Sequence, residues 1–136
     1  MKKQLFVLLG LGLLVGMSAY AQTVNLKADV PFNFIVTGAT LPAGEYTIKG
    51  LENGQTMSIS SSDRKAHTLV LSNRCESINS ATKSKLVFHR YGDRYFLANI
   101  WVAGETSGRQ LPTSGREREV ARDYSVQDVV LFAALR

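Results

Sequence analysis

The stretch that most constrains the fold of this chain runs from Lys85 to Val102 and has the pattern of a β-hairpin. Two runs rich in β-branched and aromatic residues flank Gly92-Asp93. A glycine that opens a two-residue loop is typical of a type II′ turn, and this turn fixes the register of the two strands. The predicted cross-strand pairs are Tyr91 with Arg94, Arg90 with Tyr95, His89 with Phe96, Phe88 with Leu97, Val87 with Ala98 and Leu86 with Asn99.

Both faces of this predicted hairpin are largely apolar. A hairpin of this kind is stable only when both faces are removed from water, so the rest of the chain must cover it twice. One face carries Leu86, Phe88, Tyr95, Leu97 and Trp101, and the other carries Val87, Phe96, Ala98, Ile100 and Val102.

The segments before the hairpin alternate between apolar and polar residues, which indicates short strands. The first alternating run spans residues 24–36, and Pro31 marks it as an edge strand or as one that bends at a bulge. Residues 72–84 and 103–112 carry no periodic pattern and are predicted to be surface loops. Further strands are expected around Tyr46 and Ile48, around Met57 and Ile59 (after a turn at Glu52-Asn53-Gly54), and over residues 66–72, where Leu69 and Leu71 face away from Val70.

A short helix is predicted near the C-terminus. Ser114 and Glu117 fit a capping box, in which Ser114 accepts the backbone N–H of Glu117 and the Glu117 side chain reaches back to the start of the helix. The helix would run to about Asp123. Residues 126–135 fit both helical and strand spacing, and their β-branched residues favour a closing strand. A solvated helix face is expected for Arg116, Glu117, Arg118, Glu119 and Arg122.

Together these elements predict an all-β domain. It would be an antiparallel meander of about seven strands, either a barrel-like curled sheet or a small sandwich, with one short helix near the C-terminus. The barrel-like sheet accounts better for a hairpin that is apolar on both faces.

The first 21 residues have the pattern of a secretory signal peptide. Lys2 and Lys3 precede an apolar run from Leu5 to Met17, and Ala19-Tyr20-Ala21 fits a cleavage site. The apolar run is shorter than the ~20 residues that a membrane-spanning helix requires. We therefore expect cleavage before Gln22, a single β-rich domain over residues 22–136, and export to the periplasm or the extracellular space without a remaining membrane span.

Composition and cysteine content restrict the classes of partner and the disulfides that can be expected. The hydrophobic share of 45% and the charged share of 20% are typical of a globular protein. The formal charge of +5 falls to about +3 once Lys2 and Lys3 are removed, which is too small to predict a nucleic-acid partner for an exported domain. Cys75 is the only cysteine. An internal disulfide is therefore not expected, and a partly buried packing role is favoured over an intermolecular disulfide.

Three segments, taken in order, resemble a family of small exported bacterial proteins of unknown function. They are V-P-F-N-F-I-V at 30–36, L-P-A-G-E-Y at 41–46, and the hairpin segment at 85–104 followed by R-Q-L-P at 109–112. The resemblance covers nearly all of the chain after the signal peptide. It implies an exported β-rich domain, and it implies no catalytic residue, ligand or partner.

The sequence carries no recognised catalytic or metal-binding spacing. It has two histidines, His67 and His89, and lacks H-x-x-x-H, H-E-x-x-H and G-x-S-x-G patterns. The competing interpretation is that His89 acts as a general base helped by Asp93 or Glu105, or shares a metal ion with His67. We assign no catalytic residue, metal ligand or cofactor from the sequence.

The candidate binding residues are Arg90, Tyr91, Arg94 and Tyr95, at the tip of the predicted hairpin. Interleaved arginine and tyrosine can grip a carboxylate, a phosphate or a sugar. The alternative, which we favour, is that Arg90 with Tyr95 and Tyr91 with Arg94 form cross-strand cation–π pairs that stabilise the hairpin.

Three functions remain open at this point. The leading hypothesis is an exported, non-enzymatic β domain that binds a ligand or partner in the periplasm or cell envelope, either an apolar molecule in a barrel interior or an envelope protein or glycan at the tip. The second is a hydrolase that acts on an envelope or extracellular polymer through His89. The third is a structural, self-assembling envelope subunit that pairs through the Pro31-containing strand or the C-terminal strand.

Overall fold

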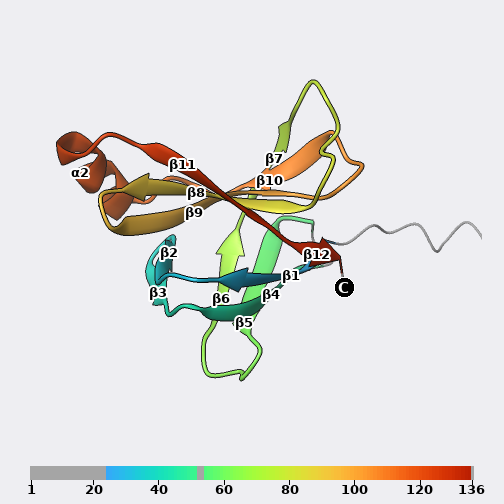
Figure 1. Ribbon diagram of the computed structural model, residues 1–136, viewed down its shortest axis with the longest axis horizontal. Helices are drawn as coiled ribbons and strands as arrows, with labels where there is room; N and C mark the ends of the chain where they lie inside the picture. The colour runs from blue at the N-terminus through green and yellow to red at the C-terminus, as the bar shows by residue number, and fades with distance from the viewer. Residues whose placement is uncertain (1–23, 52–53, 136) are drawn as a thin grey trace, which may run out of the picture.

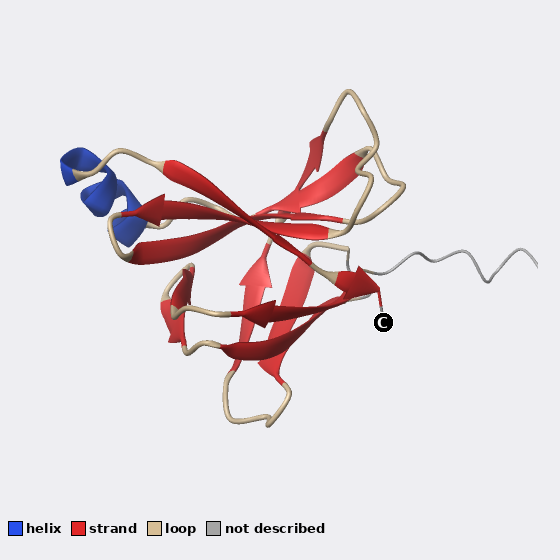
Figure 2. Ribbon diagram, viewed as in Figure 1, coloured by secondary structure: helices blue, strands red, loops and turns tan. Residues whose placement is uncertain are grey.

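Two β-sheets stacked on each other account for most of the structure, a computed structural model that describes residues 24–51 and 54–135 (Figures 1 and 2). Alternating apolar residues explain the stacking, because each sheet can bury its apolar face only against the other. The first sheet, sheet A, is antiparallel throughout. Its strands, in spatial order, are β12 (Ala134–Leu135), β1 (Asn25–Val30), β4 (Gly44–Gly50), β5 (Thr56–Ser61) and β6 (His67–Leu71).

The second sheet, sheet B, is built around the hairpin that the sequence predicts. Two short strands, β2 (Phe34–Val36) and β3 (Ala39–Leu41), join it at the tip end, where β2 pairs with the hairpin in parallel through Ile35 and Phe96. The main path, in spatial order, is β11 (Gln127–Phe132), β8 (Lys85–Tyr91), β9 (Arg94–Trp101), β10 (Ser107–Gln110) and β7 (Asn73–Glu76).

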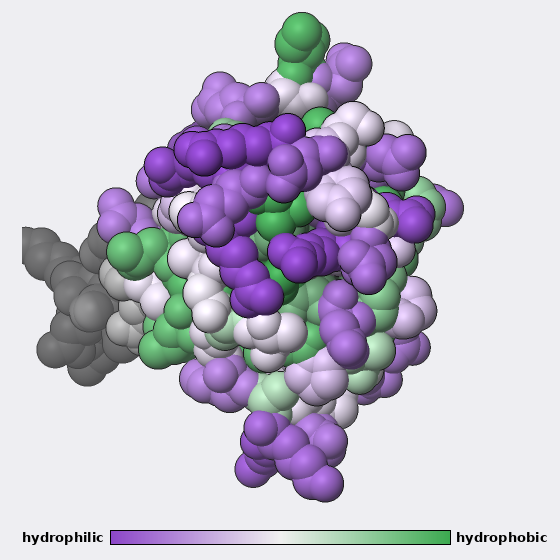
Figure 3. Space-filling model, turned by 90° about the vertical axis from the view of Figure 1, so that its left-hand side faces the viewer, coloured by the Kyte–Doolittle hydropathy of each residue, from purple (hydrophilic) through white to green (hydrophobic). Residues whose placement is uncertain are grey.

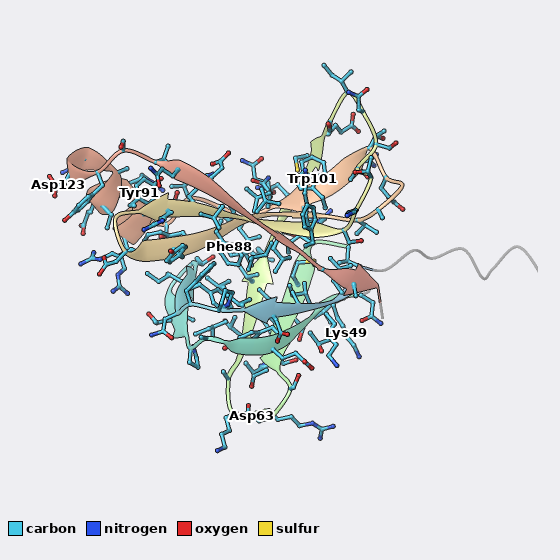
Figure 4. All side chains as sticks on the ribbon, in the orientation of Figure 1. Lys49, Asp63, Phe88, Tyr91, Trp101 and Asp123 are labelled. Carbon is cyan, nitrogen blue, oxygen red and sulfur yellow. The ribbon has the colours of Figure 1, made fainter. Side chains whose placement is uncertain are left out.

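The core lies between the two sheets. Phe88 lies at the centre of this core and is 0% exposed. Its ring meets the ring of Phe34 edge-on, with the centroids 5.6 Å apart. Phe34 in turn meets Tyr46 edge-on at 5.0 Å, so aromatic rings from β8, β2 and β4 interlock. Figure 4 shows Phe88 in this position, between the sheets.

A β-bulge corrects part of the predicted hairpin register. From Tyr91 with Arg94 to Phe88 with Leu97 the pairs are those predicted, and Gly92 has the positive φ of 62° that the turn requires. Beyond Phe88 the register shifts by one, so Val87 pairs with Asn99 and Leu86 with Ile100, where Ala98 and Asn99 were predicted. Because side chains alternate, this extra residue brings Ile100 and Val102 onto the core side of the sheet instead of Trp101.

The first alternating run is divided at Pro31 into β1 and β2, as the bend expected there implies. The prediction that this run forms an edge strand is wrong for β1, because β12 and β4 flank it on both sides. Pro31 falls just after β1, where its missing N–H removes no bond from the sheet.

Two segments predicted as loops each contain a strand, and these strands pair with each other. β7 lies within residues 72–84 and β10 within residues 103–112, and Cys75 stands opposite Gly108. On its other side β10 pairs with β9, and this approach is close: a Cβ atom on Gly108 would lie 2.6 Å from the Cε3 atom of Trp101. Charged residues and glycine hid these short strands from pattern analysis.

The predicted C-terminal helix, its start at Ser114 and the closing strand are confirmed. Helix α2 spans Gly115–Asp123, and the Ser114 hydroxyl accepts the backbone N–H of Glu117 as predicted. Residues 126–135 form the strands β11 and β12 rather than a helix.

The all-β fold class is confirmed, with twelve short strands in the described residues where about seven were expected. The sheets are not closed into a barrel, so the sandwich is the alternative that holds. Within the described residues, the chain crosses between the sheets after β1, after β3, at Ser72 after β6, and at Ala133 after β11. The predicted signal peptide and residues 52 and 53 of the predicted turn lie outside the described residues.

Candidate functional site

The hairpin tip does not present its four candidate residues together. Arg90 and Arg94 are exposed, Tyr95 is half-buried and Tyr91 is buried. The Tyr95 ring stacks on the ring of Phe32, with centroids 3.8 Å apart, and the Arg90 guanidinium lies 5.4 Å from the centroid of the Tyr95 ring. The predicted cation–π pair of Arg90 with Tyr95 is therefore present, and it occupies one side of the tip.

Tyr91 makes a different contact from the predicted pair with Arg94. Its hydroxyl donates a hydrogen bond of 2.9 Å to Oε2 of Glu117, a residue that is only 5% exposed. The Nδ1 atom of His89 lies 3.0 Å from the same oxygen. The prediction that Glu117 lies on a solvated helix face, reaching back to cap the helix, is wrong: it points inward from α2 onto the outer face of the hairpin.

This cluster of His89, Tyr91 and Glu117 fastens the helix to sheet B. Val120 of α2 packs with Ile35, Tyr91 and Phe96 in a small apolar cluster beside it. Burial and the bond to Glu117 raise the pKa of Tyr91 to about 12. In Figure 4, Tyr91 lies beside α2, and Figure 3 looks onto this end of the molecule, where hydrophilic side chains cover much of the upper half.

The surroundings of His89 differ from those of the proposed general base. The carboxylates that approach its ring are Glu117, at Nδ1, and Asp128, 3.8 Å from Nε2, rather than Asp93 or Glu105. His67 belongs to the other sheet, on β6, where its Nε2 atom lies 3.2 Å from the Ser58 hydroxyl. No group of three or more potential metal ligands occurs in residues 24–51 and 54–135.

A different surface stands out at the far side of sheet A. Strand β6 pairs with β5 alone among the described strands, so its other edge is open. Leu69 and Leu71 are 56% and 62% exposed there, although Val70 between them is buried. The sequence predicted this alternation of side chains but not that the strand ends the sheet.

The backbone groups of the same residues also face outward. The backbone N–H of Ser61 donates to the carbonyl of Ala66, and the backbone N–H of Ser72 donates to the carbonyl of Gln55, each at 2.8 Å. Both are therefore hydrogen-bonded pairs of the ladder between β5 and β6. Because such pairs alternate along an antiparallel ladder, Thr68 and Val70 bond to β5 and the residues between them point their N–H and C=O groups away. We call His67, Leu69 and Leu71 the open edge.

A groove of about 620 Å³ continues from the open edge at its His67 end. It runs between the turn after β3 and the turn from β5 to β6. Its walls include Pro42, Tyr46, Lys65 and His67. The Tyr46 hydroxyl donates a 2.6 Å hydrogen bond to the carbonyl of Pro42, which holds one wall in place.

The other strands at the ends of the sheets differ from β6. β7 carries Arg74 and Glu76, which form an exposed ion pair at 3.2 Å. β3, which within the described residues pairs with β2 alone, has three residues, and β12 has two. β11 exposes Val130 and Phe132, but its Asp128 faces His89 and Lys83 lies 5.1 Å from the centroid of the Phe132 ring. Charged side chains at an edge oppose strand addition, and β6 has none.

A small cavity of about 210 Å³ lies between the sheets near Val24. Met57, Ile100 and Val102 line it, with Arg74 and Glu105 among its polar neighbours. It is the part of the interior that corresponds to the predicted apolar-ligand site, since aromatic packing fills the centre of the sandwich.

Comparison with models of protein families, with curated proteins and with solved structures gave no match for this chain. The family resemblance drawn from the sequence therefore stays a prediction. Within the described residues, no helix is long and apolar enough to cross a membrane.

Proposed function

We propose that this chain is an exported, non-enzymatic binding domain that takes an extended polypeptide segment onto the open edge of β6. The observation that carries the proposal is the coincidence of free backbone groups and exposed leucines at His67, Leu69 and Leu71. A peptide added to a sheet edge gains main-chain hydrogen bonds, and the side chains along the edge select its sequence. The groove beyond His67 would receive the end of such a segment.

The energetics favour this surface over the hairpin tip. Complete burial of a leucine side chain is worth about 1.5–3 kcal/mol, and Leu69 and Leu71 each have more than half of their surface still to bury. At the tip, Tyr95 is already stacked on Phe32 and Tyr91 is already buried. Arg94 is the tip residue best placed to meet a partner, and its replacement by alanine tests that alternative separately.

The test uses synthetic probes of known sequence. Blocked ten-residue peptides of alternating valine and threonine are titrated against the isotope-labelled protein, with a proline-interrupted peptide as control. Binding should slow hydrogen exchange at the amides of His67, Leu69 and Leu71. A Leu69→Lys variant should bind at least tenfold more weakly, while the matched Val130→Lys variant on β11 should bind as the wild type does.

Exchange that slows elsewhere, or equal loss in both lysine variants, contradicts the proposal. Native mass spectrometry of the same sample separates it from the small-molecule alternative, because a retained compound of low mass would indicate the cavity near Val24. A hydrolase would reveal itself by ester, peptide or glycan turnover that disappears in His89→Ala.

Export is part of the proposal and has its own test. Expression of the full chain in a bacterium with two membranes should place the protein in the periplasmic fraction, with Gln22 as its first residue. An intact N-terminus in the cytoplasmic fraction would contradict export. The binding test above would still stand, because it depends on β6 alone.

A further inference from the structure

We infer that the segment bound at the open edge is β6 of a second copy of this chain, so that the protein forms a two-fold symmetric dimer. The inference rests on the proposed function, since it names the strand that fills the same edge. Antiparallel pairing about Leu69 places Leu69 opposite Leu69 of the second copy, and His67 opposite its Leu71. Sheet A of each copy would thereby join into one continuous sheet.

The backbone fits this register. The outward-pointing residues are His67, Leu69 and Leu71, which are arranged symmetrically about the middle one. The pairs Leu69 with Leu69 and His67 with Leu71 therefore join residues whose N–H and C=O groups are free to bond across the new interface, as in the hydrogen-bonded pairs of an antiparallel ladder. A shift of the register by one residue would place the free backbone groups of one copy opposite residues of the other copy whose N–H and C=O groups already bond to β5.

The side chains fit it as well. On the outer face, the two copies of Leu69 would cover each other on the axis, where both are now 56% exposed. On the inner face, Thr68 would stand opposite Val70 of the second copy, which is a pair of β-branched residues of similar shape. A two-fold axis through an apolar residue brings no like charges together, and residues 66–72 contain no Asp, Glu, Lys or Arg.

The other apolar edge does not pair with itself in this way. Symmetric pairing of β11 about Val130 would place Asp128 opposite Phe132 of the second copy. That arrangement would bury a carboxylate that now faces His89 at 3.8 Å. The open edge is thus the edge that combines free backbone, apolar side chains and self-complementary register, and a two-fold contact there closes on itself instead of propagating.

A contact made chiefly by one five-residue strand is smaller than a standard protein interface. We therefore expect dissociation in the micromolar range and a dimer that forms reversibly with concentration. Sedimentation of the wild-type protein from about 1 to 500 μM should show a monomer–dimer equilibrium. Leu69→Lys places two ammonium groups opposite each other on the axis and should raise the dissociation constant more than tenfold. Val130→Lys should leave the constant unchanged.

A cross-linking experiment fixes the register. In a Cys75→Ser background, Leu69→Cys should give a dimer with a short bis-maleimide reagent, whereas Phe132→Cys should not. A wild-type protein that stays monomeric at 500 μM, or cross-linking through position 132 alone, overturns the inference. If that monomer still binds the valine–threonine peptides at β6, the proposed function survives; if it binds none of them, both fail.

Discussion

The tip end of sheet B and the open edge of sheet A differ in what covers their apolar side chains. On sheet B, helix α2 covers the tip end of the hairpin, and even the carboxylate of Glu117 is buried and hydrogen-bonded. On sheet A, the open edge has no cover among the described residues and leaves Leu69 and Leu71 in water. We infer that the buried polar cluster around Glu117 serves to hold the structure together, whereas the exposed leucines of the open edge form the candidate interface.

If this comparison is correct, substitutions on the covered side should cost stability and substitutions on the open edge should not. The largest effect is expected at Gly108. An added Cβ atom would lie 2.6 Å from Trp101 and 2.7 Å from the carbonyl oxygen of Ile100, so one of the two strands must move. Gly108→Ala should lower the free energy of unfolding by about 3 kcal/mol, measured by urea denaturation.

The control for that substitution is Gly38→Ala. An added Cβ atom at Gly38 would meet nothing within 4 Å. It should therefore change stability by less than about 0.5 kcal/mol. Equal effects of the two substitutions would show that the pairing of β9 with β10 does not depend on close approach at Gly108.

The next largest effect is expected at Glu117. Glu117→Ala leaves the Tyr91 hydroxyl and the His89 ring without their acceptor at a buried site, which should cost about 2 kcal/mol. Glu117→Gln keeps an acceptor oxygen and should cost less. Glu119→Ala, on the exposed side of the same helix, is the matched control. Thermal unfolding should rank the three variants in that order, and a harmless Glu117→Ala would mean that the cluster does not hold α2 in place.

Alkaline pH should weaken the same region through Tyr91. Its pKa is raised to about 12 in the folded protein, above the ordinary tyrosine value of 10.0. The stabilisation is thus complete below pH 10 and is lost as the pH rises from 10 to about 12. By pH 11 the loss should reach about 1 kcal/mol. Tyr91→Phe should be less stable at pH 8 and should lack this pH dependence; an identical pH profile in the variant would assign the effect to other tyrosines.

The sequence predicts local elements well where a few adjacent residues determine them. Gly92 specified the hairpin turn, Ser114 specified the start of α2, and the β-branched pair Val129-Val130 specified β11. Each of these signals depends on neighbours along the chain, so it is visible without the tertiary fold.

What the sequence does not reveal is which elements become neighbours in space. The bulge opposite Val87 changes which residues of β9 face the core, and no residue type demands it. The sequence around Glu117 predicted a solvated residue, because its partners Tyr91 and His89 lie 26 and 28 positions away along the chain. The open edge was not predicted for the same reason. Whether a strand lies at the edge of a sheet depends on where the other strands pair, and the sequence of the strand itself does not show this.

The smallest predicted change in stability is at the open edge, and it tests the comparison most directly. Leu69→Lys replaces a side chain that is already 56% exposed, so the stability of the monomer should change by less than about 0.5 kcal/mol. Hydrogen exchange in dilute samples should be fast at the amides of His67, Leu69 and Leu71 and slow at Thr68 and Val70, because only the latter bond to β5. Raising the protein concentration should slow exchange at the first three in the wild type and leave it fast in Leu69→Lys. If Leu69→Lys instead unfolds the protein, or if all five amides exchange slowly at every concentration, then β6 is as enclosed as the hairpin under α2 and the distinction between the two regions is lost.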